Sequence, residues 1–310
     1  MVSVRLTEQL QRVKKVLKTW KEVDERVSSL CPTLLSVKGT SAATACSAGK
    51  ITDGLVGFLS GNFSNDTWSD EYLGVNATVN KEDEAKKAAN GVTFQGAWAE
   101  WPVGAQGQNQ LYHFANYNFT LVATVSIHNV PKGNNTIPLI GVYAMNGTGN
   151  NVLLGLSYNK EKKWKLLCGG EMTNEHSSNW EANKTYQVAI VLQNGTQSTA
   201  YVDGQRVGGD APCKLETTDS KEISHFYIGG DGRSADNTES EEVSVTVTNV
   251  LLYNRPLSSE EIDAPKPNKA SIPASAGRNA AVVGTSSTAV NGPAVQKTVS
   301  LPTPGGPTVN

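Results

Sequence analysis

The clearest alternation of apolar and polar residues lies between Val243 and Leu257. Successive side chains of a strand point to opposite faces of a sheet. One face should then carry Val245, Val247, Leu251 and Tyr253, and the other Thr246, Thr248, Val250 and Leu252. The second face is polar at its start, whereas both faces are apolar from Val250 to Leu252. This pattern predicts a closing strand that ends between two packed layers.

The residues after this strand indicate how it ends. Pro256 lacks a backbone donor and should terminate the hydrogen-bonded ladder. Ser258, with acidic residues directly after it, predicts an N-cap and a short helical turn.

Near the N-terminus, apolar residues recur at spacings of three and four, at Leu6, Leu10, Val13, Leu17, Trp20, Val23, Val27 and Leu30. This predicts one amphipathic helix of about seven turns. Thr7 is the expected N-cap. The basic residues between Arg12 and Lys21 are interpreted as a solvated face, because Glu22, Asp24 and Glu25 follow directly. An apolar stripe of this length needs a surface to pack against.

The middle of the chain reads as short strands separated by Gly/Asn turns. The expected strands cover Phe119–Ile127, Ile137–Met145, Val152–Tyr158, Lys163–Cys168, Tyr186–Leu192 and His225–Gly230. Asp203 and Gly204 suit the two positive φ angles of a two-residue hairpin. One helical insert is expected between Asn80 and Gly91. Strands at this density indicate a sandwich or barrel.

Four segments follow from these patterns. Residues 1–30 form the helix, residues 31–50 a Ser/Thr/Ala-rich linker, and residues 51–263 the β domain. Residues 264–310 contain no aromatic residue, no acid and no cysteine. Such a segment cannot bury enough apolar surface to offset its ordering entropy, so we expect a disordered, mucin-like stalk.

The closing strand also carries a family resemblance. Val245-Thr-Val-Thr-Asn-Val-Leu-Leu-Tyr-Asn-Arg255 resembles the Val-Thr-Val-x-Asn-Val-Phe-Leu-Tyr-Asn-Arg motif of the trypanosomal trans-sialidase superfamily, with Leu251 where the family has Phe. Segments 5–10, 54–63 and 100–104 also resemble that family. The resemblance implies its C-terminal lectin-like domain: an all-β, antiparallel jelly-roll β-sandwich of the concanavalin A-like and laminin-G-like type. The amphipathic helix would connect it to an N-terminal sialidase propeller that this sequence lacks.

The same resemblance implies a function. The expected role is non-catalytic adhesion to a host-cell surface protein or glycan, with exposure as a surface antigen. The implied adhesion motif is Val245, Thr246, Val247, Asn249, Val250, Leu251, Leu252, Tyr253, Asn254 and Arg255, of which only Asn249, Tyr253, Asn254 and Arg255 are expected to reach a partner. Membrane attachment would come only from a lipid anchor absent here. The alternative is an accessory domain that supports the propeller of an active enzyme.

No catalytic inventory is apparent. Sialidase chemistry, as the family implies it, needs an arginine cluster and a Tyr–Glu pair, but Arg206, Arg233 and Arg255 fall in separate β segments. The histidines lack metal-ligand spacing, at His113, His128, His176 and His225. Calcium is left as an open alternative at Asp203, Asp210, Asp231 and Asp236. We therefore expect no enzyme activity and no cofactor. A strict lectin is a third possibility, which requires an exposed Trp or Tyr.

Net charge and targeting signals limit the protein classes to which the chain could belong. A net charge of -2 gives no electrostatic case for nucleic acid. No apolar run approaches the ~20 residues that span a bilayer, and the residues after Met1 do not resemble a signal peptide.

The cysteines and glycosylation sequons indicate a secreted protein. Cys31, Cys46, Cys168 and Cys213 suggest two disulfides, of which Cys31–Cys46 with Cys168–Cys213 is the simplest connectivity; four buried thiols are the alternative. Asn-x-Ser/Thr sequons occur at Asn62, Asn65, Asn76, Asn118, Asn134, Asn146, Asn183 and Asn194. Together they predict a cell-surface or extracellular protein that uses the secretory pathway. Without a signal peptide, we expect the chain to be part of a longer protein.

Overall fold

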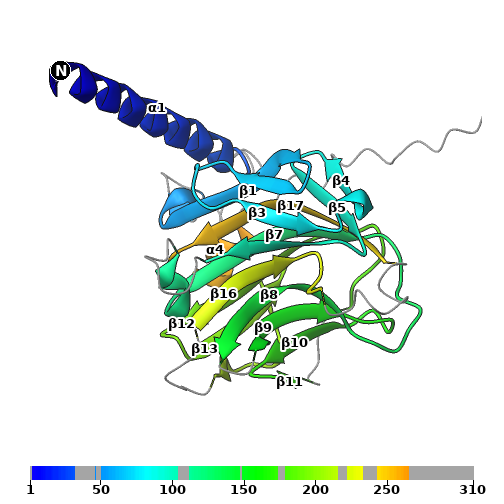
Figure 1. Ribbon diagram of the computed structural model, residues 1–310. Helices are drawn as coiled ribbons and strands as arrows, with labels where there is room; N and C mark the ends of the chain where they lie inside the picture. The colour runs from blue at the N-terminus through cyan, green and yellow to red at the C-terminus, as the bar shows by residue number, and fades with distance from the viewer. Residues whose placement is uncertain are drawn as a thin grey trace, which may run out of the picture. The chain divides into compact units, whose positions relative to one another are not determined.

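The computed structural model describes residues 2–31, 46, 50–103, 112–146, 149–173, 179–215, 222–232 and 243–264. Within these residues the chain forms seventeen strands and two α-helices. The strands pair antiparallel. The predicted all-β jelly-roll sandwich with a long preceding helix is therefore confirmed (Figure 1).

The strands divide into two layers joined by one strand. Sheet A contains, in spatial order, β4 (Ala85–Ala88), β5 (Gly91–Gln95), β17 (Ser244–Tyr253), β7 (Phe119–Ile127), β12 (Thr185–Gln193) and β13 (Gln197–Val202), with β14 (Gln205–Val207) and β15 (Cys213–Lys214) beside β13. Sheet B contains β2 (Thr67–Asp70), β3 (Ala77–Asn80), β6 (Trp98–Pro102), β16 (Glu222–Ile228), β8 (Ile137–Asn146), β9 (Gly149–Tyr158), β10 (Trp164–Cys168) and β11 (Glu171–Met172). The strand β1 (Leu55–Ser64) pairs with β17 through its first half and with β2 through its second.

Sheet A is covered on both faces, which explains why β7 is buried along its whole length. Leu121, Ala123 and Val125 pack in the core between the sheets, whereas Val122 faces the opposite side. The second face is covered by an outer cluster, which consists of Val23, Val27, Ile51, Phe58, Val122, Ala189, Val191, Tyr201, Leu251, Tyr253, Leu257 and Ile262. A strand covered on both faces needs apolar residues in succession, and β7 has them at Leu121, Val122 and Ala123.

The closing strand β17 contains a bulge that changes its predicted faces. Thr248 pairs with Thr124 and Leu251 pairs with Val122, so Asn249 and Val250 together lie opposite one residue of β7. Asn249 has φ +49°, a left-handed conformation that Asn tolerates better than most residues. The expectation that Leu251 and Tyr253 share a face with Val245 and Val247 is wrong, because the extra residue reverses the alternation.

After the bulge, Val250 and Leu252 enter the core between the sheets, and Leu251 and Tyr253 join the outer cluster. The prediction of one polar and one apolar face up to Thr248 is confirmed, since Val245 and Val247 are buried and Thr246 and Thr248 are half-buried. The prediction that both faces are covered from Val250 onward is confirmed as well.

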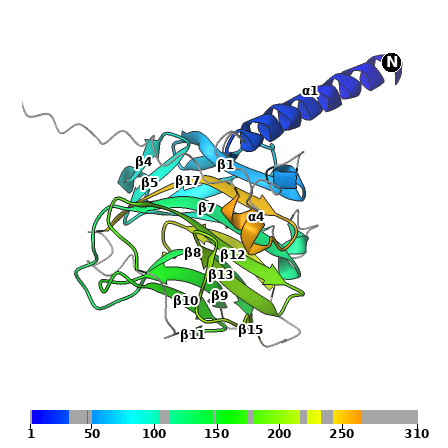
Figure 2. The same cartoon turned by 180° about the vertical axis from the view of Figure 1, so that it is seen from behind.

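The helices partly match their sequence signals. The helix α1 covers Val2–Ser28, so Thr7 lies inside it and is not its N-cap. The helix α4 covers Ser259–Asp263 and has the expected cap, because the Ser258 hydroxyl accepts a hydrogen bond from the Glu261 amide and the Glu261 carboxylate accepts one from the Ser258 amide. Figure 2 shows α4 from the other side of the molecule. No helix in the described residues is long and apolar enough to cross a membrane.

The expected helical insert between Asn80 and Gly91 is wrong. Only Glu82–Glu84 forms a 3₁₀ turn (η2), and β4 then pairs with β5 in a tight hairpin that places Ala88 opposite Gly91. Two further 3₁₀ turns occur, η1 (Lys50–Thr52) and η3 (His113–Asn116). By contrast, the Asp203–Gly204 hairpin is confirmed, with φ +50° and +77° and with Val202 opposite Gln205.

Two disulfides join the cysteines in the sequence-adjacent pairing. Cys31 binds Cys46 and Cys168 binds Cys213, with Cα–Cα distances of 5.8 and 6.6 Å. The second bridge ties β10 of sheet B to β15 of sheet A. Most of the linker 31–50, the stalk 265–310, His176, Arg233 and Asp236 lie outside the described residues, as does the side chain of Asn146.

Candidate functional site

The motif with the family resemblance is mostly interior. Tyr253 is 1% exposed and Asn249 8% exposed, so the expectation that these two side chains reach a partner is wrong for the folded domain. Arg255 is half-buried, and Asn254 is exposed. Of the four residues expected to reach a partner, Asn254 and Arg255 are accessible, and the adhesive role of the motif stays a prediction.

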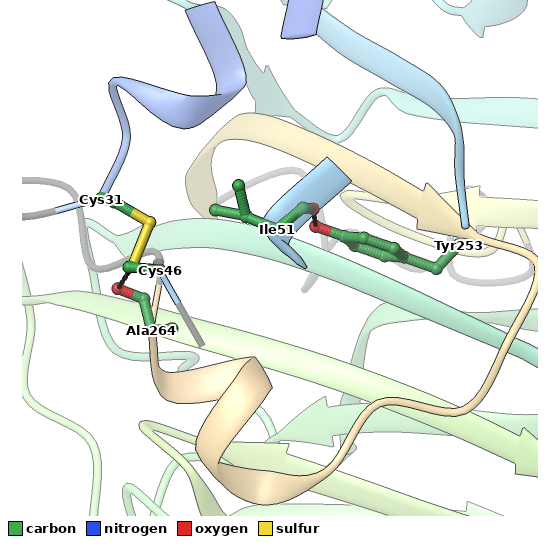
Figure 3. The surroundings of a disulfide bond; sticks show 5 residues. All are labelled: Cys31, Cys46, Ile51, Tyr253 and Ala264. Atoms are coloured by element: carbon green, nitrogen blue, oxygen red, sulfur yellow. Dashed lines mark hydrogen bonds between the residues drawn. A yellow bond between two sulfur atoms is a disulfide. The ribbon is translucent and has the colours of Figure 1, made fainter. Parts of the chain in front are cut away.

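Tyr253 connects the closing strand to the start of the domain. Its hydroxyl donates a hydrogen bond of 2.8 Å to the Ile51 carbonyl oxygen, and its ring lies in the outer cluster (Figure 3). Burial raises the pKa of the Tyr253 hydroxyl, which keeps it a neutral donor. The side chain thus binds two segments about 200 residues apart in sequence, a structural task for which both its ring and its hydroxyl are needed.

The same region holds the end of α1 and the end of α4 together. Cys31, just after α1, forms its disulfide with Cys46, whose sulfur lies 3.5 Å from the Ala264 carbonyl oxygen (Figure 3). Ala264 directly follows α4. We call this convergence of Cys31, Cys46, Ile51, Tyr253 and Ala264 the clasp.

Arg255 forms ion pairs beside the clasp. Its Nε lies 2.9 Å from the Asp53 carbonyl oxygen, to which it donates, and its Nη2 lies 2.9 Å from Glu261 Oε1. Burial would raise the pKa of the Glu261 carboxyl, but hydrogen bonds from Arg255 and Ser258 outweigh it and lower that pKa. The Arg255 guanidinium is therefore already occupied within the domain.

The last two turns of α1 dock on the end of the sandwich through polar and apolar contacts. Val23 and Val27 are buried in the outer cluster. The Tyr72 hydroxyl donates to Asp24 Oδ1 at 2.5 Å, and burial followed by this hydrogen bond raises the Tyr72 pKa. Arg26 binds Glu71 at 3.2 Å and donates to the Ser60 hydroxyl at 2.9 Å.

The rest of α1 exposes its apolar stripe. Leu6, Leu10, Val13, Leu17 and Trp20 are exposed large hydrophobic residues, although the sequence pattern predicts that the stripe packs on something. Figures 1 and 2 both show α1 running away from the strands toward its N-terminal end. Contiguous exposed apolar surface of this kind marks an interaction site. This stripe is the strongest candidate for a functional surface in the described residues.

In the part of the chain that the structure describes, we find no catalytic cluster beside this stripe. Within the described ranges, no three His, Cys, Asp or Glu side chains converge as metal ligands. Arg206 donates to the Asp210 carbonyl oxygen, far along the chain from the ion pairs of Arg255. His128 bridges Asn183 and Thr246, and His225 stacks on Tyr143 with ring centroids 4.7 Å apart. These histidines have structural partners.

Most tryptophans give little support to a strict lectin, whereas Tyr117 and Trp20 are exposed. Trp68, Trp101, Trp164 and Trp180 are fully buried, and Trp98 is half-buried with its indole nitrogen donating to Glu100 at 2.9 Å. A sugar-binding platform needs an exposed ring, and the four buried tryptophans belong to the core.

The sequons differ in exposure. Exposed sequon residues are Asn62, Asn65, Asn76, Asn134, Asn183 and Asn194, whereas Asn118 is half-buried. The Asn118 side-chain oxygen accepts a hydrogen bond from the Asn194 amide, and the Asn76 oxygen accepts one from the Asp70 amide. Glycan occupancy stays a prediction at each position.

Sequence reasoning missed the residues that dock α1. Arg26, Ser60, Glu71 and Tyr72 carry no motif and are distant in sequence, so only the folded arrangement brings them together. The one available signal was the last turn of the helical stripe, where Val23 and Val27 mark the buried side.

The family profile and the curated relatives that match this chain point to the same protein family. The family profile "Trans-sialidase, C-terminal domain" matches residues 51–260. A sialidase of Trypanosoma cruzi is 35% identical over 266 residues, which are 84% of this chain and 22% of that protein. Sialidase 85-1.1 of T. cruzi is 36% identical over 270 residues, which are 84% of this chain and 33% of that protein.

A solved structure agrees with these relatives. Trypanosoma rangeli sialidase in complex with 2,3-difluorosialic acid superposes with a TM-score of 0.70 at 40% sequence identity, over 86% of this chain and 40% of that chain. The present chain thus spans only 22% to 40% of the length of these proteins.

Proposed function

This chain belongs to the trans-sialidase family, in which it corresponds to the C-terminal domain, and from that we propose that it is a non-catalytic module that docks on a sialidase domain. The observation that carries the proposal is the exposed apolar stripe of α1. In water such a stripe is unfavourable by roughly 25 cal/mol for each Å² of apolar surface. The proposal therefore assigns it a partner surface, and the greater length of the related sialidases supplies one.

The docked end of α1 supports the same role. Arg26, Asp24 and Val27 fix the helix on the sandwich at its C-terminal end, so the exposed part cannot turn freely. A helix fixed at one end and apolar along the other is suited to hold two domains in one orientation. The proposal also includes that the chain by itself does not catalyse sialoside hydrolysis. Hydrolysis of a sialoside by the purified chain would contradict it.

The docking role is tested in a chimera. The full chain replaces the part of T. rangeli sialidase that it matches, and α1 carries either Leu10→Asp with Leu17→Asp or, as a control, Thr7→Asp with Gln11→Asp. Both pairs add two acids to exposed positions, but the control pair lies on a different face of the helix. We expect the stripe pair to lower the Tm of the chimera by about 4 °C or more, because two Leu side chains lose their burial.

The control pair should change this Tm by less than about 1 °C, and hydrogen exchange in α1 should rise only with the stripe pair. In the chain alone, neither pair should alter the Tm, since the stripe is exposed there. Equal behaviour of the two pairs in the chimera would exclude docking through the stripe.

As a second function, we propose that the protein is secreted or displayed on a cell surface and adheres to a host-cell surface protein or glycan. Its support is the exposed Asn254 beside the half-buried Arg255, where the motif reaches the surface. Asn254→Ala should weaken binding of the full chain to mammalian cells several-fold without changing its Tm, as measured by flow cytometry. Asn151→Ala, at another exposed position, is the control. Unchanged binding by Asn254→Ala would remove the motif from adhesion.

A further inference from the structure

One exposed residue beside α1 has a backbone conformation that its side chain disfavours. Leu73, in the loop between β2 and β3, has φ +64° and is 60% exposed. A bulky residue in the left-handed region is strained, and an exposed leucine recovers none of that strain through burial. Glycine or asparagine would suit this position better, so the leucine points to a use outside the folded domain.

The conformation is imposed by a buried carboxylate. Asp70, 2% exposed, accepts hydrogen bonds from the Phe58 amide at 2.7 Å and the Tyr72 amide at 3.3 Å through Oδ1, and from the Gly74 amide at 2.8 Å through Oδ2. The Leu73 amide donates to the Asp70 carbonyl oxygen at 3.1 Å. Burial raises the Asp70 pKa despite these bonds. The loop is therefore rigid, and it presents Leu73 outward.

Leu73 lies next to the end of the exposed helical stripe. The Trp20 indole nitrogen donates to the Tyr72 carbonyl oxygen at 2.8 Å, and Tyr72 precedes Leu73. Trp20 is itself 44% exposed. Its side chain is thus held at the junction of α1 and the loop, with an apolar face left in water. Through this hydrogen bond the end of the α1 stripe lies against the loop that carries Leu73.

We propose that Trp20 and Leu73 form a pre-organised anchor that binds an apolar recess of the sialidase domain. This rests on the proposed docking function and extends it from one helix to two elements. Because the anchor spans α1 and the sandwich, its engagement fixes the angle between them in addition to adding contact area. Trp is among the residue types that contribute most to protein interfaces, which makes Trp20 the principal contact of the anchor.

The charges of α1 favour an apolar recess. Lys18 and Lys21 lie 3.6 and 4.0 Å from Glu22 and Glu25, with which they pair along the helix. Lys18 and Lys21 thus have acidic neighbours on α1 itself, although these exposed pairs are weak.

The test uses Leu73→Asn, because asparagine accepts positive φ but is polar. In the full chain alone, relief of strain should raise the Tm by about 2–4 °C. In the T. rangeli chimera the same change should remove docking contacts, so that hydrogen exchange of α1 increases about tenfold or more. A higher Tm of the chain alone, together with faster hydrogen exchange of α1 in the chimera, is the expected result for a strained residue that binds a partner.

Val130→Asn is the matched control, since Val130 is an exposed apolar residue at negative φ. It should leave α1 exchange unchanged in the chimera. A lower Tm of the Leu73→Asn chain would show that Leu73 serves the fold, and unchanged α1 exchange in its chimera would show that Leu73 makes no contact; either result overturns the anchor.

The outcomes separate the two proposals. If Leu10→Asp with Leu17→Asp loosens α1 in the chimera and Leu73→Asn does not, the docking function stands and the anchor is wrong. If neither does, both are wrong. A self-associated chain in sedimentation, dissociated by Leu73→Asn, would assign the patch to a second copy and would also overturn the proposal.

Discussion

Replacement of Tyr253 by alanine is expected to lower the free energy of unfolding by about 3–5 kcal/mol, because a fully buried aromatic ring is lost from the outer cluster. Tyr253→Phe should lose only about 1–2 kcal/mol, since it keeps the ring and removes the hydrogen bond to the Ile51 carbonyl oxygen. Urea denaturation of the full chain, followed by tryptophan fluorescence, measures both values.

Asn254→Ala is the control for this pair, because its side chain is exposed one position further along. It should change stability by less than about 0.5 kcal/mol. The comparison matters for adhesion. Binding lost with Tyr253→Ala but not with Asn254→Ala would reflect the lost fold and not a lost contact. A Tyr253→Ala chain as stable as the parent would mean that the clasp does not hold the strand.

Much of this fold could be predicted from local patterns. Phe119–Ile127 is a strand with the predicted bounds, because the run is rich in β-branched and aliphatic residues and is too short for a typical buried helix. The Asp203–Gly204 turn is equally local, since Asp-Gly is one of the few residue pairs that suit two successive positive φ angles. The helix pattern also placed α1 to within two residues at its end.

The errors arose where tertiary contacts override a local signal. The acids and lysines between Asn80 and Gly91 resemble a helix, yet pairing with β5 makes Ala85–Ala88 a strand. In β17 the rule of alternation failed at Asn249, because a bulge adds one residue that no count of apolar positions reveals. Only the asparagine inside an otherwise β-branched run hinted at it.

Only part of the candidate site could be predicted from the sequence in the same way. The stripe from Leu6 to Trp20 follows from spacing alone, and its need for a partner follows from its length. Leu73 could not be predicted as part of the site, because its proposed role depends on its backbone φ angle and on the hydrogen bonds of its loop to Asp70. The family motif was identified as a unit, but its burial was only partly foreseen.

The bulge and the hairpin that opposes it form one structural unit. Gly91 pairs with Thr248, and the Asn249 amide donates to the Asn90 carbonyl oxygen at 3.0 Å. A Cβ added to Gly91 would lie 2.0 Å from the Val247 carbonyl oxygen and 2.7 Å from the Thr248 Cα. Both are backbone atoms of β17, so neither can move without displacing the strand.

Gly91→Ala is therefore expected to destabilise the domain by at least about 3 kcal/mol, although it adds a single methyl group. Gly61→Ala is the matched control, because its nearest atom is the Asn90 amide nitrogen at 3.5 Å, an ordinary contact; its effect should stay below about 1 kcal/mol. Urea midpoints compare the two, and hydrogen exchange should rise in β5 and β17 of Gly91→Ala alone. Similar midpoints would show that β17 can move away from β5 at little cost, so that the bulge and the β4–β5 hairpin do not form one rigid unit.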